Sequence, residues 1–153
     1  MIFRHLPVSA ESQPNLLDCN CLAVRQAARY VTQLYDRHLA QSGLRTGQYG
    51  ILAKLKRLGS MTINELAAEL IIDRTTLGRN IRPLQRDGLI AVGPGKSDRR
   101  SKELRLTRSG VERFRTAQKG WSKAQAEFER TFGTKRAEAL RTLLEEVTTR
   151  DLS

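Results

Sequence analysis

Residues 62–107 constrain the fold of this chain more than any other part of its sequence. Thr62 is followed three residues later by Glu65, the spacing of a capping box in which each side chain bonds the other's backbone N–H. Asp73 can cap a second helix, and Gly88 is placed to end it, since glycine is common just beyond a helix end. Two short helices joined by a turn predict a helix-turn-helix.

The second of these helices divides into an apolar face and a cationic face. Leu77, Ile81 and Leu84 have the spacing of an inward stripe. The residues that remain outside are Arg74, Thr75, Thr76, Arg79, Asn80, Arg82 and Arg86. Cationic and hydrogen-bonding groups of this kind suit phosphates and base edges, so this face predicts contact with duplex DNA. Pro83 lies within the helix and is expected to bend it, with Arg86 turned away from the DNA.

A short strand, a charged turn and a returning strand are predicted after the second helix. Residues 89–92 form the first strand and residues 102–106 the second, in which Leu104 and Leu106 alternate with charged residues. The charged residues of the turn are Lys96, Asp98, Arg99 and Arg100. The sequence therefore predicts a β-hairpin wing beside the helix-turn-helix.

Amphipathic helices are predicted on both sides of this region. One has an apolar stripe from Leu17 to Leu39 and ends at Gly43, and residues 46–58, with Thr46 as the cap, form another. Thr107 can cap a long helix of about 25 residues, roughly 37 Å, and Thr134 begins a final one. These terminal helices have more apolar surface than the central lobe can cover. A homodimer would bury it and present two recognition helices to a two-fold DNA site.

The expected fold class is mainly α with a small β-hairpin wing (α+β), that is, a winged helix-turn-helix with a helical dimerisation region from both termini. The expected organisation is a flexible arm at 1–15, a dimerisation helix at 16–45, a winged helix-turn-helix DNA-binding domain at 46–107, and dimerisation helices at 108–153.

Positive charge is concentrated in the same region. The 153 residues include 27 Lys and Arg against 16 Asp and Glu, a formal net charge of +11. Nine basic and three acidic residues lie between Arg74 and Arg105, which gives +6 of that total in about a fifth of the length. Concentrated positive charge favours polyanions through counterion release. The sequence has no run of the roughly 20 apolar residues that a membrane span needs. A cytoplasmic location without membrane contact is expected.

The order of elements and several short motifs resemble the MarR family of bacterial transcription regulators. Asp98-Arg99-Arg100 followed by Leu106-Thr107 resembles the family's D-x-R and L-T wing motifs, and residues 84–90 resemble its L-x-x-x-G-L-I motif. The resemblance spans roughly residues 17–147. It implies an obligate dimer that represses genes at a pseudo-palindromic operator and releases DNA when a small molecule, often phenolic, or an oxidant binds or reacts.

The resemblance also assigns roles to individual residues. Arg100 is implied as the minor-groove residue at the wing tip, with Asp98 holding it by an ion pair; an arginine in a narrow minor groove feels an enhanced negative potential. Arg79 and Asn80 would face the major groove, where arginine recognises guanine and asparagine adenine. Arg74, Thr75 and Thr76 would contact phosphates.

The first helix resembles the branch of the family that senses organic hydroperoxides. There a thiol at the position of Cys21 is oxidised and bonded by tyrosines of the partner chain; Tyr35 matches one of them, while Arg25 replaces the other. Tyr35 lies about 21 Å along the helix from Cys21, so contact would have to be between subunits. The other interpretation is that Cys21 is a small buried apolar residue, as free cysteines commonly are. A resting disulfide between Cys19 and Cys21 is not expected.

No catalytic or metal-binding motif is found, so neither an enzyme nor a cofactor is expected. Gly95-Lys96-Ser97 has no glycine five residues earlier, as a P-loop needs, because that residue is Ile90. Cys19, Cys21 and His38 do not have the spacing of a structural zinc site. The alternative to a DNA-binding regulator is a winged-helix module that binds acidic protein partners without reading a DNA sequence.

Overall fold

The computed structural model describes residues 15–151, in two compact units that meet at residues 31 and 32. In the first unit, a 3-10 helix, η1 (Leu16–Asp18), leads into α1 (Asn20–Leu39), which continues into the second unit. The predicted N-terminal arm lies, apart from Asn15, outside the described residues.

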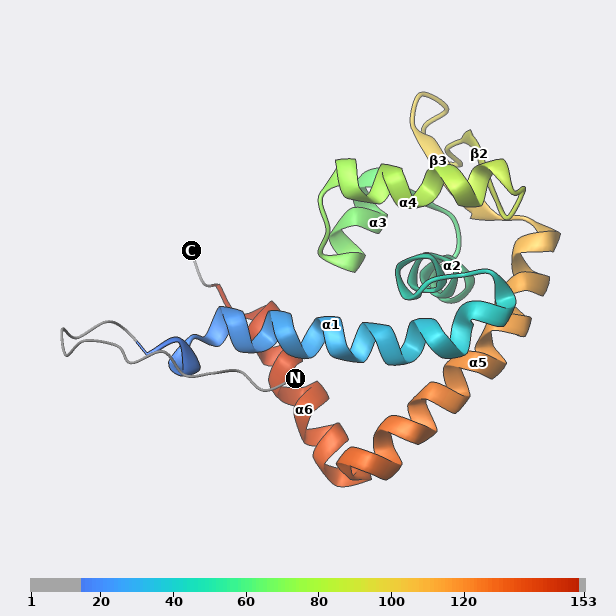
Figure 1. Cartoon of the computed structure of the whole chain (residues 1–153). Helices are drawn as coiled ribbons and strands as arrows, with labels where there is room; N and C mark the ends of the chain where they lie inside the picture. Colours follow the sequence, from blue (N-terminus) through green and yellow to red (C-terminus); the bar gives the residue numbers. More distant parts are fainter. Residues whose placement is uncertain (1–14, 152–153) are drawn as a thin grey trace. The chain divides into compact units, whose positions relative to one another are not determined.

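The second unit contains the predicted helix-turn-helix. After η2 (Ala40–Ser42) come α2 (Thr46–Leu58), α3 (Ile63–Leu70) and α4 (Arg74–Arg86) (Figure 1). The Thr62–Glu65 capping box at the start of α3 is confirmed by both hydrogen bonds, at 2.8 and 3.2 Å. Thr46 is not the cap of α2 but its first residue, because the capping position is the extended Arg45; the Thr46 N–H and hydroxyl both donate to Asp36 Oδ1 at 2.7 Å.

A small antiparallel sheet completes this lobe. Its strands are β1 (Met61–Thr62), β2 (Ile90–Pro94) and β3 (Lys102–Leu106), in the order β1-β3-β2. The register pairs Met61 with Leu104 and Ile90 with Leu106. Leu104 is 1% exposed in the middle strand, so the predicted alternation places the hairpin against the core.

The core of the lobe lies between α2, α3, α4 and the sheet. All three residues of the predicted α4 stripe, Leu77, Ile81 and Leu84, are buried. Leu66 of α3 and Leu52 of α2 are fully buried beside them. On the other side of α2, the ring of Tyr49 stacks on the rings of Phe114 and Trp121, with centroids 5.3 and 6.3 Å apart. The spacing of Tyr49, Leu52, Leu55 and Leu58 predicts one inward stripe on α2, and Leu58 departs from it, because it is 47% exposed while the other three are buried.

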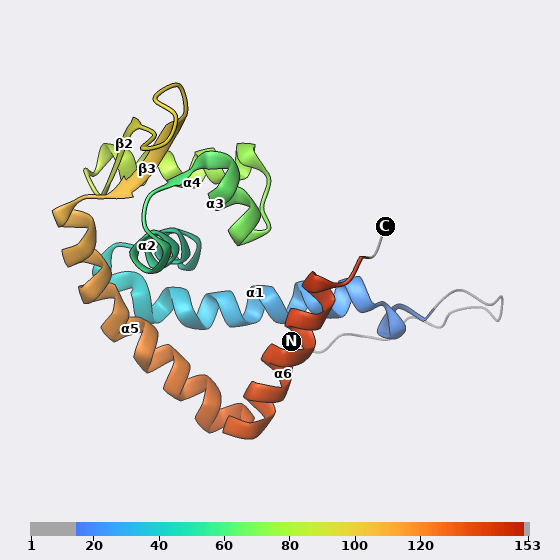
Figure 2. The same ribbon diagram turned by 180° about the vertical axis from the view of Figure 1, so that it is seen from behind.

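Two helices follow the sheet. α5 (Arg108–Phe132) begins at Thr107, whose hydroxyl accepts the N–H of Gly110 at 3.0 Å, and its 25 residues agree with the predicted length. α6 (Thr134–Thr149) begins after Gly133 and turns back from the end of α5 (Figure 2). Leu143, Leu144 and Val147 of α6 are 61%, 42% and 51% exposed, so the described residues of one chain leave these apolar side chains of α6 uncovered.

Candidate nucleic-acid interface

The outward face of α4 is cationic, and among the described residues only Arg86 of its arginines has a carboxylate within ion-pair distance. Because α4 turns 100° per residue, the side opposite the buried stripe contains Thr75, Arg79, Arg82 and Arg86, all exposed. Within residues 15–151 no carboxylate lies within ion-pair distance of Arg74, Arg79 or Arg82. Contact between these three guanidinium groups and a polyanion would therefore break no ion pair within the described residues.

Pro83 does not end the recognition helix. α4 runs without interruption to Arg86, and the N–H of Asp87 donates to the carbonyl of Pro83 at 3.0 Å. Since Arg86 follows Arg79 by seven residues, almost two full turns, the two lie on the same side of the helix. Arg86 therefore belongs with the outward cationic residues, although Nε is 3.7 Å from the exposed carboxylate of Asp87.

The start of α4 is fixed by its capping residue. Asp73 accepts the backbone N–H of Thr76 at 2.8 Å and its hydroxyl at 2.6 Å. These bonds lower the pKa of Asp73 from its ordinary value, because they stabilise the ionised carboxylate. The cap orders the first turn, where the exposed Arg74 and Thr75 are placed.

Asn80 is less accessible than the arginines around it. Its side-chain amide donates to the carbonyl of Thr76 at 3.2 Å, and the side chain lies toward α2, 3.8 Å from where a Cβ on Gly47 would stand. To bond a base edge, the amide would first have to leave this carbonyl. The predicted role of Asn80 in reading adenine therefore requires a change of rotamer, whereas Arg79 is already exposed.

The tip of the wing, residues 95–101, is tied together by its own hydrogen bonds. The Ser101 hydroxyl and backbone N–H both donate to the carbonyl of Asp98, and the N–H of Gly95 donates to the carbonyl of Ser101 at 2.8 Å. A Cβ on Gly95 would lie 2.3 Å from the Ser101 hydroxyl and 2.5 Å from the Asp98 carbonyl oxygen. The tip is therefore a preformed loop in which only glycine fits at position 95.

Asp98 holds Arg100 by its backbone. Its carboxylate accepts the Arg100 N–H at 2.9 Å, and within the described residues the two side chains form no ion pair. The expected ion pair is therefore not present. The exposed cationic side chains of the tip are Lys96, Arg99 and Arg100, and Ser97 and Asp98 are exposed beside them.

Two surface hollows connect the wing with the helices. One, of about 360 Å³, is lined by the start of α3, the start of α4 and the base of the wing, with Arg74, Arg100 and Lys102 around it. The other, of about 660 Å³, is lined by β2 and the wing tip and includes Arg99. Thr62, Asn64 and Ser101 add hydrogen-bonding groups to the first hollow. Asn64 and Lys102 are not among the site residues that the sequence predicts, since neither lies on α4 or the wing tip.

The two cysteines lie at the start of α1. Cys19 precedes the helix, and its Sγ accepts the N–H of Leu22 at 3.4 Å; Cys21 is in the first turn and exposed. The interpretation of Cys21 as a buried residue is therefore wrong for a single chain. Arg25, one turn further along α1, is also exposed.

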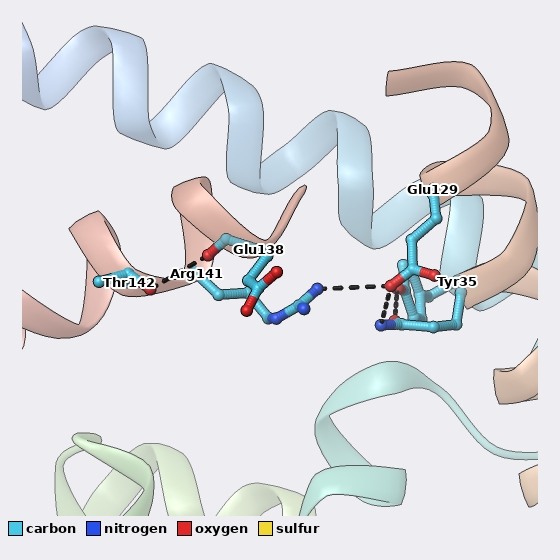
Figure 3. A network of polar contacts seen from close by, with 6 residues as sticks. Tyr35, Glu129, Glu138, Arg141 and Thr142 are labelled. Carbon is cyan, nitrogen blue, oxygen red and sulfur yellow. Dashed lines mark hydrogen bonds and ion pairs between the residues drawn. The ribbon is translucent and has the colours of Figure 1, made fainter. Parts of the chain in front are cut away.

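Tyr35 belongs to a polar network in the second unit (Figure 3). Its hydroxyl donates to Gln125 Oε1, and the Gln125 amide and Arg141 Nη1 both reach Glu129 Oε1, at 3.2 and 3.5 Å. Burial, and then the charge of Glu129, raise the pKa of the Tyr35 phenol. The network connects α5 with α6 and with the end of α1, so in the single chain the phenol is already bonded.

Two further properties of the described residues bear on function. Between residues 15 and 151, no helix combines the length and apolar composition that a membrane crossing needs. In the same part of the chain, no three His, Cys, Asp or Glu side chains are grouped as a metal ion would require.

Comparison with known proteins agrees with this geometry. The model of the MarR family matches residues 44–102. A structure of the transcriptional regulator MosR of M. tuberculosis in complex with DNA is 36% identical, covers 87% of this chain and 100% of that chain, and has a TM-score of 0.70. A cysteine-to-serine mutant of MarR from E. coli, complexed with operator DNA, is 19% identical at a TM-score of 0.74, covering 83% of this chain and 91% of that chain, which shows the fold.

A curated relative gives a shorter match. The transcriptional activatory protein BadR of Rhodopseudomonas palustris is 30% identical over 105 residues. The match spans 67% of this chain but only 60% of BadR, less than two thirds of that relative's length.

The fold and the cationic interface define a winged helix-turn-helix protein. The chain belongs to the MarR family of transcriptional regulators.

Proposed function

We propose that this protein is a transcriptional regulator that binds a pseudo-palindromic operator in duplex DNA as a homodimer. The observation that supports this most directly is the row of exposed arginines on α4, of which Arg74, Arg79 and Arg82 have no ion-pair partner within residues 15–151. A preformed cationic wing lies next to it. In the complex, α4 would occupy the major groove, and Arg100 would enter the adjacent minor groove.

Phosphate contacts would position the protein and base contacts would select the operator. Arg74, Thr75 and Thr76 at the capped start of α4 suit phosphates, together with Lys96 and Arg99 of the wing. Arg79 and Arg82, with Asn80 after a rotamer change, suit the base edges. Asp98 acts on DNA indirectly, because it holds the backbone beneath Arg100.

The homodimer is proposed from the apolar surface that one chain leaves uncovered. Leu17 and Val24 of the first unit are 89% and 50% exposed, and Leu143, Leu144 and Val147 of α6 are exposed as well. Residues 16–45 and 108–153 would form the dimerisation region, and residues 46–107 the DNA-binding domain. A regulator that occupies its operator can block RNA polymerase without binding the polymerase. We therefore propose that this protein represses transcription.

The proposed release signal is an oxidant or a small phenolic ligand. Cys21, exposed in the first turn of α1 and followed by Arg25, could react as a thiolate with an organic hydroperoxide. The sulfur would attack the terminal peroxide oxygen and the O–O bond would break. The alcohol would leave, with the thiol converted to sulfenic acid. Tyr35 of the partner could then bond the oxidised sulfur after leaving Gln125.

A salt titration tests the main proposal. Affinity for a duplex from the protein's own promoter region should fall steeply with salt and should exceed affinity for random duplex at every salt concentration. Equal affinity for the two duplexes would favour the alternative, a winged-helix module that binds acidic proteins. A cytoplasmic location and the absence of catalysis are part of the same proposal.

The signal is tested separately on the DNA complex. Organic hydroperoxide should release the wild-type protein but not Cys21→Ser, while an aromatic acid should act on both if a phenolic site exists. Equal release of both proteins by peroxide would exclude Cys21 as the sensor.

A further inference from the structure

A small cavity is lined by residues from the end of α1, from η2 and from the middle of α5, all in the second unit and none on α4 or the wing. Its volume is about 220 Å³. The lining side chains that matter here are Arg37 and Gln41 on one side and Lys119 and Lys123 on the other. None of the three aromatic rings that stack between α2 and α5 lines it.

The two sides of the cavity face each other at one-turn spacing. Arg37 and Gln41 are four residues apart, as are Lys119 and Lys123 on α5. Two lysines at this spacing on a helix repel each other, which by itself destabilises the helix. A negative charge between the cations would offset this repulsion.

The base of the cavity is held by direct backbone contact. At Gly120, between the two lysines, an added Cβ would lie 2.2 Å from the carbonyl oxygen of His38. Only glycine allows this approach of α5 to α1. Because the backbones of α1 and α5 are in contact here, the Cα atoms that carry the four polar side chains are held in fixed positions relative to one another.

Among the described residues, no carboxylate forms an ion pair with the cations that line this cavity. No Asp or Glu lines the cavity, and within residues 15–151 Arg37, Lys119 and Lys123 form no ion pair. Glu127 of α5 does not line the cavity; it is bonded to His38 Nε2 at 2.6 Å, and this bond, with a smaller contribution from the charge of Arg37, lowers the pKa of Glu127. The side-chain amide of Gln41 likewise has no partner among the described residues and can donate. Three cations and one free amide thus surround one small space.

We propose that this cavity binds a small oxyanion, a carboxylate or phosphate group of a metabolite. Arg37 would offer a two-pronged guanidinium, Lys119 and Lys123 point charges, and Gln41 a neutral N–H donor. The bound anion would link the end of α1 to α5 and stabilise the folded chain by binding the native state alone. The proposal does not depend on DNA binding, because none of these residues lies on α4 or the wing.

The test uses inorganic phosphate and acetate as probes, each against chloride at equal ionic strength. Wild-type protein should bind one equivalent per chain, and its Tm should rise with probe concentration. Amide NMR shifts should centre on Gln41, Lys119 and Gly120. Comparing the two probes identifies the ligand's group. A lower Kd for phosphate would indicate a phosphoryl group, and a lower Kd for acetate a carboxylate.

The decisive variants are matched in charge. Lys119→Gln with Lys123→Gln should weaken the probe by about tenfold or more, the loss expected for one or two charge-assisted hydrogen bonds. The double variant Lys119→Arg with Lys123→Arg should keep the wild-type affinity for the probe, because both positive charges remain. Lys56→Gln with Lys135→Gln removes the same charge from exposed positions elsewhere and should change nothing. No saturable binding, or equal loss in the two glutamine pairs, would overturn the proposal, since only non-specific attraction to a basic protein would remain.

Discussion

At the scale of single residues, α4 separates groups that are free to contact DNA from groups already engaged. Arg79 is exposed and has no ion-pair partner in the described part of the chain, whereas the side-chain amide of its neighbour Asn80 donates to the carbonyl of Thr76 and lies toward α2. Sequence periodicity identified the outward side of the helix. It could not distinguish these two residues, because the bond of Asn80 depends on a rotamer and on the small Gly47 across from it.

This difference predicts unequal effects of two alanine substitutions. Arg79→Ala should weaken operator binding by roughly 1–3 kcal/mol and relax the preference at one base pair, since a bidentate base contact is lost. Asn80→Ala should cost less, because the wild-type amide must give up an internal bond before it reaches a base. Fluorescence anisotropy with single-base operator variants measures both. A larger loss for Asn80→Ala would show that its amide, and not Arg79, makes the main base contact.

Leu77 provides a contrasting test, because it lies on the opposite side of the same helix. Its side chain is 0% exposed among the core residues of the lobe, so Leu77→Ala should lower the free energy of unfolding by about 2–5 kcal/mol. Chemical denaturation followed by circular dichroism gives this value. Thr75→Ala on the exposed face should stay within roughly 0.5 kcal/mol of wild type, as surface changes usually do.

At the scale of elements, the boundaries could be predicted where the chain marks them with capping chemistry. Thr62 with Glu65, Asp73 and Thr107 each begin a helix where expected, since their side-chain oxygens accept backbone N–H groups that would otherwise be unpaired. The structure of the wing tip could not be predicted, because it depends on Ser101 and Gly95 bonding across a loop, which no periodicity encodes.

The wing loop supports a prediction about shape rather than charge. Gly95→Ala would place a methyl group within 2.5 Å of the Asp98 carbonyl oxygen, so the tip must open and Arg100 must move. Operator affinity should fall toward that of Arg100→Ala, while Tm changes little, because the tip is distant from the buried core. Gly50→Ala on α2, whose added methyl would make only an ordinary contact with Leu70 at 4.0 Å, is the matched control away from the proposed DNA interface. Unchanged DNA binding by Gly95→Ala would show that the minor groove does not use the preformed tip.

The contact between the end of α1 and α5 predicts a dependence on acid. The hydrogen bond from His38 is the main cause that lowers the pKa of Glu127, so ionised Glu127 favours the folded state. Its contribution is complete above the ordinary glutamate pKa and is lost as pH falls through the lowered value. The Tm difference between wild type and Glu127→Gln should therefore be present at neutral pH and vanish in acid. A difference that persisted unchanged at the lowest pH would contradict this linkage.

At the scale of the whole molecule, the exposed apolar residues of α6 repeat at helical spacing. Leu143, Leu144 and Val147 lie along one side, and Leu140 continues it with a half-buried side chain. The sequence predicted the stripe correctly, but its partner could not be predicted, because in the proposed homodimer the covering surface comes from a second chain. Three apolar side chains on one helix face are more than isolated exposed residues, and they fit a partner helix.

This stripe yields the last prediction. Leu144→Glu with Val147→Glu should give a monomer by sedimentation, because each charge would be buried unpaired in the dimer. The far-ultraviolet circular dichroism should be kept, since both side chains are already exposed in the single chain. Operator affinity should collapse toward that of a half-site duplex, because one recognition helix cannot span two half-sites. Thr142→Glu with Thr149→Glu adds the same charge on the opposite side of α6 and should leave the dimer intact. A Leu144→Glu, Val147→Glu protein that stays dimeric would place the dimer contact elsewhere, and one that binds the full operator as a monomer would refute the two-fold mode of binding.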